Sequence, residues 1–440
     1  MTYKTYNILD YGATSDGRLC TREVQNAIDA CFLAGGGIVD IPEGEYVVAG
    51  LRLRSNVTLH LLRNARLVGS IDPEDYFAYL DDELEPIPVE DRNMIVSTAV
   101  EGHTSRSIMP YSRWNNAIIR VINAENVAII GELGSIIDGR NCFDAQGEEN
   151  YRGPHAINIW FSKNITLRDY AVINSANWAH AIQNSQNITC KTVSVRGGHD
   201  GFDVRTCDNV LIEDCVFRTG DDCIAGFDNI DVTIRRCVFD SACSMLRFGG
   251  SDVLVEECYG SAPSTYGFRG HLTPEQKKNR ADTDENCRHS CHDVFLYYCD
   301  NRAKVRRTPG NIVFRSCDFY NPDSVLNHPF GHLWCSNRAL DNITFEDCLI
   351  EGVRMPSRLS SPANEPLTLI MKNCKVTARE GFENEALIEA HNLKKIVLDG
   401  TTFENFNDPT VACTPDCEIV STNSTAIKLA ENKNPPPEGF

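Results

Sequence analysis

Along most of the chain, an asparagine or aspartate is followed by a short run in which apolar and polar residues alternate. Such runs begin at Asn164, Asn187, Asn209, Asp231 and Asp252, at intervals of 23, 22, 22 and 21 residues. Alternation is typical of half-buried strands, and a constant interval of this length is typical of a solenoid with one coil per repeat. A β-sandwich also has many short strands but no reason to repeat at a constant interval. The pattern predicts an all-β chain, a single parallel β-helix domain over residues 1–440.

The asparagine or aspartate at the corner of each repeat is expected to play one of two roles in the turn. The side chain hydrogen-bonds the turn backbone, or the residue adopts a left-handed conformation that asparagine tolerates well. The same feature begins further runs at Asn56, Asn126, Asp293, Asn311 and Asn342.

Near the N-terminus the pattern changes to helical spacing, and residues 21–34 are predicted to form one amphipathic helix. Thr21 is placed to cap its start, and Gly35-Gly36-Gly37 is placed to end it. A lone helix ahead of the strands is expected to cover the open edge of the first coil, so residues 1–40 form an N-terminal cap. The apolar face consists of Val24, Ala27, Ile28 and Cys31.

Two stretches interrupt the repeat, at about residues 76–115 and about residues 259–290. Both are predicted to form loops beside the strand faces, where long loops usually carry function. The last residues, about 430–440, contain three consecutive prolines and are expected to form an exposed tail.

The formal net charge of −19 argues against nucleic acid and anionic membrane surfaces as partners. An N-terminal apolar signal segment and a run of about 18 apolar residues are both missing from the sequence, which favours a cytoplasmic protein. The sequence leaves the oligomeric state open.

The 19 cysteines are not grouped in the close pairs that mark zinc or redox sites. We therefore expect free, buried thiols that stack at one position of successive coils, with no metal and no cofactor. The cysteines that end strand-like runs are Cys215, Cys237, Cys258, Cys299, Cys317, Cys348 and Cys374.

Candidate chemistry gathers at His199-Asp200 and Asp221-Asp222, because Asp200 precedes Asp221 by 21 residues, one repeat. If each repeat is one coil, these carboxylates lie on neighbouring rungs, about 4.7–4.9 Å apart. Carboxylates that close cannot all ionise equally, and one should hold its proton to higher pH. That difference is what general acid and general base catalysis on one bond requires.

Arg247 and Arg269 are 22 residues apart, so they are also expected on successive rungs. Such a pair could bind a sugar carboxylate. Alternatively, both arginines pair with acidic residues of the scaffold.

These motifs resemble glycoside hydrolase family 28, the polygalacturonase family of right-handed parallel β-helices. The similarity covers most of the chain, including Tyr11-Gly-Ala, Gly35-Gly-Gly and Asn174-Ser-Ala-Asn-Trp178. His199-Asp200-Gly-Phe-Asp203 matches the family's Asn-Thr-Asp motif at the aspartate, and Gly220-Asp221-Asp222 matches its paired aspartates.

The resemblance implies a glycosidase that cleaves pectin-type oligosaccharides with inversion. In those terms, Asp221 is the general acid, and Asp200 and Asp222 position and deprotonate the attacking water. The sequence departs from the family in two places. Ala242-Cys243-Ser244 stands where the family has Gly-His-Gly, and Phe268-Arg269-Gly270-His271 replaces its Arg-x-Lys pair.

Substrate contacts are therefore expected from His199, Arg247, Arg269, His271 and Trp178. A cytoplasmic enzyme meets imported oligosaccharides, which favours exo-action, and loops at the two insertions could close one end of a groove. Two alternatives stay open: a β-helix lyase or epimerase, and a carbohydrate-binding protein without catalysis.

Overall fold

The computed structural model describes residues 4–77, 80–87, 113–279, 287–301, 303–332, 335–384 and 386–432. The chain divides into two compact units. Unit 1 consists of Met1–Asp203, Cys207–Val216 and Phe268–Cys287, and unit 2 of Val204–Thr206, Phe217–Gly267 and Arg288–Phe440. The expected single domain stays a prediction. Within the described residues, none of the helices is both long enough and apolar enough to cross a membrane.

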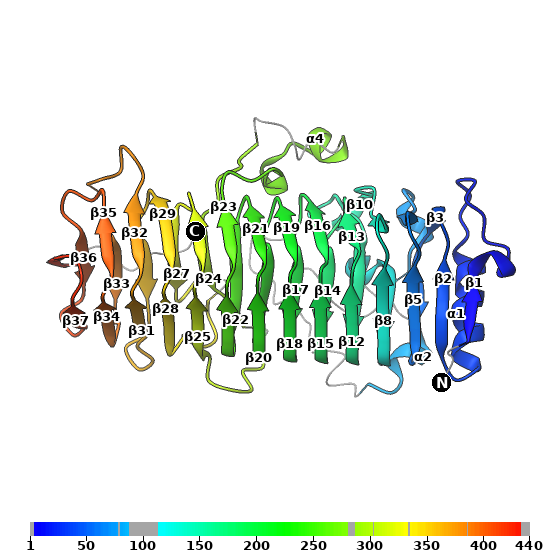
Figure 1. Cartoon of the computed structure of the whole chain (residues 1–440), viewed down its shortest axis with the longest axis horizontal. Coiled ribbons are helices and arrows are strands. Elements are labelled where there is room, and N and C mark those ends of the chain that lie inside the picture. Colours follow the sequence, from blue (N-terminus) through cyan, green and yellow to red (C-terminus); the bar gives the residue numbers. More distant parts are fainter. Residues whose placement is uncertain are drawn as a thin grey trace. The chain divides into compact units, whose positions relative to one another are not determined.

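Unit 1 is built from short parallel strands, each paired with the strand one coil away (Figure 1). Registers are regular: Ile165 pairs with Ile188, and Ile188 with Val210. These residues are buried while their neighbours in sequence are not, which confirms the alternation expected from the sequence. One sheet contains β1 (Thr5–Asn7), β2 (Gly37–Ile41), β4 (Leu51–Leu53), β5 (Val57–Leu61), β7 (Ala117–Ile122), β8 (Glu125–Gly131), β11 (His155–Trp160), β12 (Lys163–Arg168), β14 (His180–Gln183), β15 (Gln186–Lys191) and β18 (Asp208–Glu213). A second contains β3 (Gly44–Val48), β6 (Ala65–Gly69), β9 (Ile136–Asp138), β13 (Ala171–Ile173) and β16 (Ser194–Gly197).

Helix α1 (Thr21–Leu33) packs on β1 and β2 at the start of unit 1, where a cap was expected. Its predicted face, Val24, Ala27, Ile28 and Cys31, is fully buried. The predicted cap residue was wrong. Cys20 is the N-cap, and the Thr21 hydroxyl instead accepts a hydrogen bond from the Ala49 backbone N–H at 2.9 Å. Thr21 therefore ties the helix to the first coil. A 3-10 turn, η1 (Ile8–Tyr11), precedes it.

The recurrent corner asparagines of unit 1 adopt the left-handed conformation, with φ between 53° and 61° from Asn56 to Asn209. Their side chains bond to one another rather than to the turn backbone. Each amide nitrogen donates to the amide oxygen of the preceding corner, at 2.9–3.0 Å. The column therefore links five successive coils: Asn56, Asn126, Asn164, Asn187 and Asn209.

Unit 2 continues the same design with parallel strands in two sheets. Apolar residues stack from coil to coil in its core. The rings of Phe314 and Phe345, for example, are stacked with centroids 4.7 Å apart. The first sheet contains β20 (Ile224–Arg235), β22 (Ser244–Glu256), β24 (Asp293–Tyr297), β25 (Gly310–Arg315), β27 (Ser324–Pro329), β28 (Asn342–Glu346), β30 (Ser357–Ser360), β31 (Thr368–Lys372), β33 (Ile388–His391), β34 (Lys395–Asp399), β36 (Thr410–Cys413), β37 (Glu418–Thr422) and β38 (Lys428–Glu431). The second contains β21 (Val238–Ser241), β23 (Tyr259–Ser261), β26 (Asp318–Tyr320), β29 (Leu349–Val353), β32 (Lys375–Ala378) and β35 (Thr402–Glu404). Strands β17 (Phe202–Arg205) and β19 (Val216–Thr219) are divided by the unit boundary.

All 19 cysteines are free, as expected. Five cysteines of unit 2 form the predicted column. Each of their thiols donates a hydrogen bond to the backbone carbonyl two residues earlier, at 3.3–3.4 Å. Cys299 was wrongly included. Its backbone forms an isolated parallel β-bridge with that of Cys335, and its thiol is free. Cys299 follows β24, whereas the column cysteines that flank it follow β22 and β25. The column consists of Cys237, Cys258, Cys317, Cys348 and Cys374.

The two insertions contain more regular structure than the loops predicted for them. The first includes α2 (Asp81–Leu84) and η3 (Arg113–Asn115), after the short turn η2 (Pro73–Asp75), and residues 88–112 lie outside the described chain. The second includes β23, η4 (Arg269–His271) and α4 (Pro274–Lys278), with 280–286 outside it. Strand β23 belongs to the regular sheet, so this insertion begins after Ser261. Residues 433–440 of the expected tail also lie outside.

Candidate active site

Asp221 and Asp222 lie in the turn that leads into β20 of unit 2, where two hydroxyl groups hold the backbone. The side chains of Thr219 and Ser241 both donate to the Asp221 carbonyl oxygen, at 2.7 and 2.8 Å. The two carboxyl groups have different surroundings: Asp221 is partly exposed, whereas Asp222 is 1% exposed. One turn therefore presents one carboxyl group toward solvent and withdraws the other.

Asp222 is held at both carboxylate oxygens by residues of β22. One oxygen accepts a hydrogen bond from the Ser244 backbone N–H at 3.0 Å, and the other lies 2.6 Å from Nε of Arg247. Burial raises the pKa of Asp222 to about 6, against the lowering effect of Arg247 and with a further raising effect of Asp221. Asp222 is therefore a stronger base than an ordinary aspartate.

Asp293 is a second buried carboxyl group beside this turn, and sequence reasoning missed it. Its position at the start of a run suggested a corner residue, but it is 2% exposed and is not in the left-handed conformation. Asp293 pairs in register with Ser244, and Nδ2 of Asn327 donates to it at 3.0 Å. Burial raises its pKa to about 7, with Asp222 contributing in the same direction.

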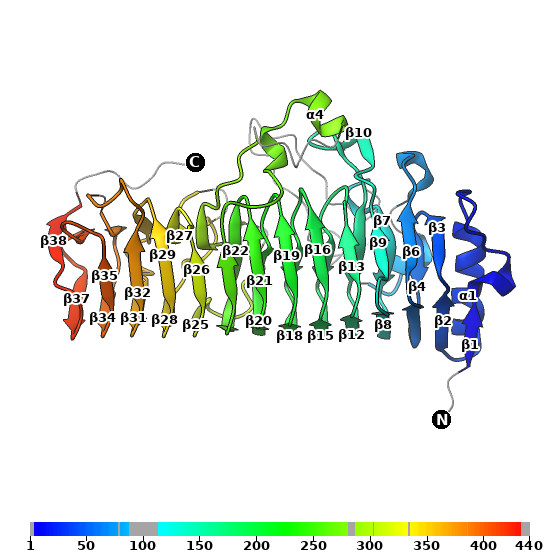
Figure 2. The same cartoon turned by 45° about the horizontal axis from the view of Figure 1, so that its top comes forward.

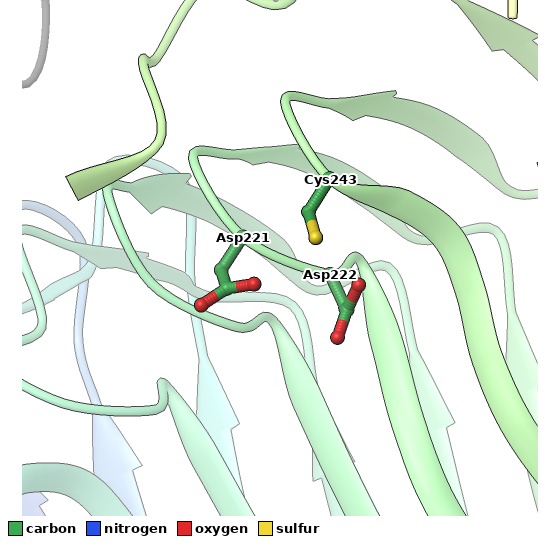
Figure 3. A group of neighbouring side chains, drawn as sticks. All are labelled: Asp221, Asp222 and Cys243. Atoms are coloured by element: carbon green, nitrogen blue, oxygen red, sulfur yellow. The ribbon is translucent and has the colours of Figure 1, made fainter. Parts of the chain in front are cut away.

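Cys243 completes a group of three potential ligands with Asp221 and Asp222, whose donor atoms lie within 4.8 Å of one another (Figure 3). Its surroundings do not suit a cation. Arg247 already neutralises Asp222, and burial, followed by the two carboxylates, raises the pKa of the Cys243 thiol well above its usual range. The thiol therefore stays protonated and faces the carboxylates as a weak donor.

Arg247 and Arg269 do not form the expected pair on successive rungs. Arg247 lies in β22, where its register partner on the next coil is Leu296. Arg269 lies in η4 and belongs to unit 1. The prediction from the 22-residue interval was wrong, because the chain leaves the regular coil after β23 and Arg269 lies in the segment that follows. Arg247 binds an aspartate, as the scaffold alternative expected, but that aspartate is the predicted catalytic residue Asp222.

In unit 1, His199 stacks on the ring of Tyr151 with centroids 5.7 Å apart. His199 is 3% exposed, and its pKa lies well below the usual value because of burial and then the nearby cations, Arg152 first. The imidazole is therefore neutral. Tyr151, which the sequence did not single out, lies just after β10 (Phe143–Glu148).

Arg269 also lies near Tyr151. It is hydrogen-bonded to Asn141, which precedes it by 128 residues. Its guanidinium donates to Oδ1 of Asn141 at 2.9 Å and to the Lys277 carbonyl at 3.1 Å. Its Cζ lies 5.6 Å from the centre of the Tyr151 ring. Figure 2 shows the segment that contains α4 beside β10.

The other predicted site residues, Trp178, His271 and Asp200, have different surroundings. Trp178 is buried in unit 1, where its ring meets Trp114 edge-on at 4.7 Å. His271 ends η4, and its side chain lies outside the described part. Asp200 is 1% exposed, directly after His199, and its backbone carbonyl accepts from the Ala179 N–H at 2.9 Å. Asp200 belongs to unit 1, so its predicted stacking with Asp221 stays a prediction.

Comparison with known proteins shows what the chain is similar to. The family model "Glycosyl hydrolases family 28" matches residues 90–241, a stretch that contains all three predicted catalytic aspartates. The matched stretch is about a third of the chain, and over it the chain is similar to this family. A probable polygalacturonase of Vitis vinifera is 28% identical over 233 residues, which are 50% of this chain and 43% of that protein. An exo-poly-alpha-D-galacturonosidase of Dickeya chrysanthemi is 25% identical over 256 residues, 50% of this chain and 41% of that protein.

The chain thus spans less than half the length of these curated relatives. Its fold is that of a solved exopolygalacturonase from Thermotoga maritima, with a TM-score of 0.63 and 19% identity over 86% of this chain and 88% of that one. The neighbour is a right-handed parallel β-helix, and the predicted fold class is confirmed. The two departures from the family's motifs lie at Cys243–Ser244, where the Ser244 N–H bonds Asp222, and at the Arg269 segment beside Tyr151.

Proposed function

We propose that this protein is a glycoside hydrolase that cleaves pectin-type oligosaccharides, galacturonides or rhamnogalacturonan-like chains. The observation that carries the proposal is the turn at Asp221–Asp222. It combines a partly exposed carboxyl group with a buried one whose pKa is raised to about 6, in a stretch that matches the family 28 glycosyl hydrolases. Two adjacent carboxyl groups in different environments can divide acid and base work.

In the proposed reaction, Asp221 donates a proton to the glycosidic oxygen as the bond from that oxygen to the anomeric carbon breaks. A water molecule attacks the same carbon from the opposite side and gives its proton to Asp222, with Asp200 positioning it. The exposed carboxyl group is the one that can reach the leaving oxygen. The raised pKa of Asp222 supports its role as base, because a stronger base takes the water proton more readily.

Three finer points belong to the same proposal. The reaction inverts the anomeric configuration, since no carboxylate forms a covalent intermediate in this scheme. Action is from the chain end, which the family relative named as an exo-galacturonosidase and the segment folded over Tyr151 both support. The location is cytoplasmic, because 19 free cysteines suit a reducing compartment.

The test is a product analysis on galacturonide, rhamnogalacturonan and neutral oligosaccharides, with anomers followed by NMR. We expect new reducing ends, an inverted first anomer, and monomer from the earliest times on a galacturonide or rhamnogalacturonan substrate. Early intermediate-length oligomers would overturn exo-action, and a retained anomer would overturn inversion. Cleavage confined to neutral sugars would overturn the substrate class.

A second candidate, a uronate lyase or epimerase, is favoured by one observation. Three cations lie near His199, and they would stabilise the negative charge that develops when the proton beside a sugar carboxylate is removed. A lyase product absorbs in the ultraviolet because elimination creates a double bond, whereas hydrolysis does not. An epimerase would incorporate deuterium from heavy water without cleavage, so the same incubations separate all three activities.

A further inference from the structure

Five residues of unit 1, from three separate parts of the chain, form what we call the Tyr151 cluster. The Tyr151 ring is its centre. Nζ of Lys277 lies 4.2 Å from the ring centroid, Cζ of Arg269 5.6 Å, and Cζ of Arg152 5.9 Å. His199 stacks on the same ring. Three cations and a neutral imidazole thus surround one buried aromatic side chain.

Two carboxylates lie next to Arg152, at one edge of the Tyr151 cluster. Nε of Arg152 lies 3.1 Å from a carboxylate oxygen of Glu149 and 3.7 Å from one of Glu148. Lys277 makes no ion pair with a carboxylate within the described residues. Burial lowers the pKa of Lys277, and Arg152 and Arg269 act in the same direction against Glu149. A nearby anion would therefore stabilise the charged form of Lys277.

Polar atoms in and beside the Tyr151 cluster also lack partners. Both ring nitrogens of His199, and Nδ2 of Asn177, are buried without a hydrogen bond in the described part of the chain. Asn177 is joined to the cluster through its Oδ1, which accepts from Arg152 at 3.4 Å. Such buried groups are normally satisfied by protein, water or ligand. A neutral imidazole offers one donor and one acceptor, and the amide offers a donor.

We propose that the Tyr151 cluster binds the carboxylate of a uronic-acid unit, with Lys277 and Arg269 facing the charge and His199 and Asn177 bonding its oxygens and a neighbouring hydroxyl. The choice of a uronic acid rests on the proposed function; the need for a small oxyanion rests on the cluster alone. Asp200, a predicted catalytic carboxylate, directly follows His199 in the sequence. The cluster would thereby replace the Arg-x-Lys pair that this sequence lacks.

Binding is measured by calorimetry in the full chain carrying Asp221→Asn, so that the ligand survives. The probes are trigalacturonate and its fully methyl-esterified form, which differ in charge but hardly in shape. We expect the acid to bind at least about tenfold more tightly, the usual worth of one charge-assisted contact. Lys277→Met should remove most of that preference and leave the ester's affinity unchanged.

The matched control is Lys278→Met, because Lys278 is exposed on the same helix, α4. We expect this variant to bind like its parent, and Lys277→Arg to restore the preference for the acid. Far-ultraviolet circular dichroism checks that each variant is folded. Equal affinity of the parent for acid and ester would overturn the proposal, as would equal losses in the Lys277 and Lys278 variants. Sulfate or phosphate competing as strongly as the uronate would overturn the uronic-acid assignment.

Failure of the proposed hydrolysis is distinguishable from failure of this inference. If the protein with Asp221 intact cleaves nothing but the charge preference depends on Lys277, the hydrolase proposal falls and the carboxylate site stands. If it cleaves galacturonides with no such dependence, the reverse holds.

Discussion

Units 1 and 2 bury ionisable groups of opposite kinds. In unit 1, three cations gather around Tyr151 and His199, and the imidazole is kept neutral. In unit 2, Asp222 pairs with Arg247 and has Asp221 and Asp293 as acidic neighbours, and the pKa values of Asp222 and Asp293 are raised. Surplus positive charge suits recognition of an anion, and carboxyl groups that resist ionisation suit proton transfer. The proposals above therefore assign anion recognition to unit 1 and the acid–base pair Asp221–Asp222 to unit 2, with Asp200 of unit 1 as the third predicted catalytic residue.

The largest effect should come from Asp221→Asn, because an amide cannot donate the proton that the leaving oxygen needs. We expect kcat to fall by roughly three orders of magnitude or more with the fold unchanged, as kinetics and circular dichroism would show. Asp231→Asn is the control, since Asp231 is an exposed corner residue of the same unit. Near-normal turnover in folded Asp221→Asn would remove the acid assignment.

Arg247→Met should break the charge balance of unit 2. Asp222 loses its ion pair while it stays buried, which costs roughly 3–5 kcal/mol of stability when the carboxylate is ionised. The pKa of Asp222 should rise above its present value of about 6, since Arg247 lowers it, so the acid limb of kcat/KM should move to higher pH. Chemical denaturation and a pH–rate profile measure the two effects.

Arg315→Met is the matched control for this substitution, because Arg315 pairs with Glu346 at 3.2 Å on the surface of the same unit. A surface pair contributes at most about 1 kcal/mol. If both variants lose the same stability, the ion pair at Asp222 has no special importance.

Asp293→Asn tests the effect of the buried Asp293 carboxyl group on the stability of unit 2. The folded pKa of about 7 exceeds the ordinary 3.8, so folded protein holds this proton between about pH 4 and 7 while the unfolded chain releases it. The free energy of unfolding therefore falls as pH rises through this window, by an amount on the order of a few kcal/mol. The amide variant should flatten that slope and be the more stable protein above pH 7. An unchanged slope in urea titrations would contradict the assignment.

The smallest effect should come from the scaffold outside both clusters. Asn187→Ala loses two side-chain bonds of the asparagine column and places alanine at φ 56°, at a cost of about 1–2 kcal/mol. Asn187→Gly should cost less, because glycine adopts this conformation freely. Thermal unfolding measures both. Uronate binding and catalysis should be unchanged in either variant, and a loss in them would show that the division into clusters and scaffold is too sharp.

Features that repeat along the chain were predictable from the sequence. Alternation located the strands, the constant interval identified the coils, and Asn164, Asn187 and Asn209 revealed the corners. These features are local or recur in successive coils, so the same pattern can be recognised several times along the sequence. The resemblance added the Asp221–Asp222 turn for a similar reason, since a short contiguous motif carries it. Even so, asparagine side chains bonding along the column, rather than to their own turns, became visible only in the stacked coils.

Features that depend on distant segments were decided by the tertiary structure. Nothing in the spacing of Arg269 shows that its segment folds back to Asn141, 128 residues earlier, or that Lys277 lies over Tyr151. The repeat even misled at Asp293, where the corner pattern concealed a buried carboxyl group. Charge and burial at such places depend on which side chains meet across coils. A periodic sequence specifies the coil itself but does not specify where a departing loop returns.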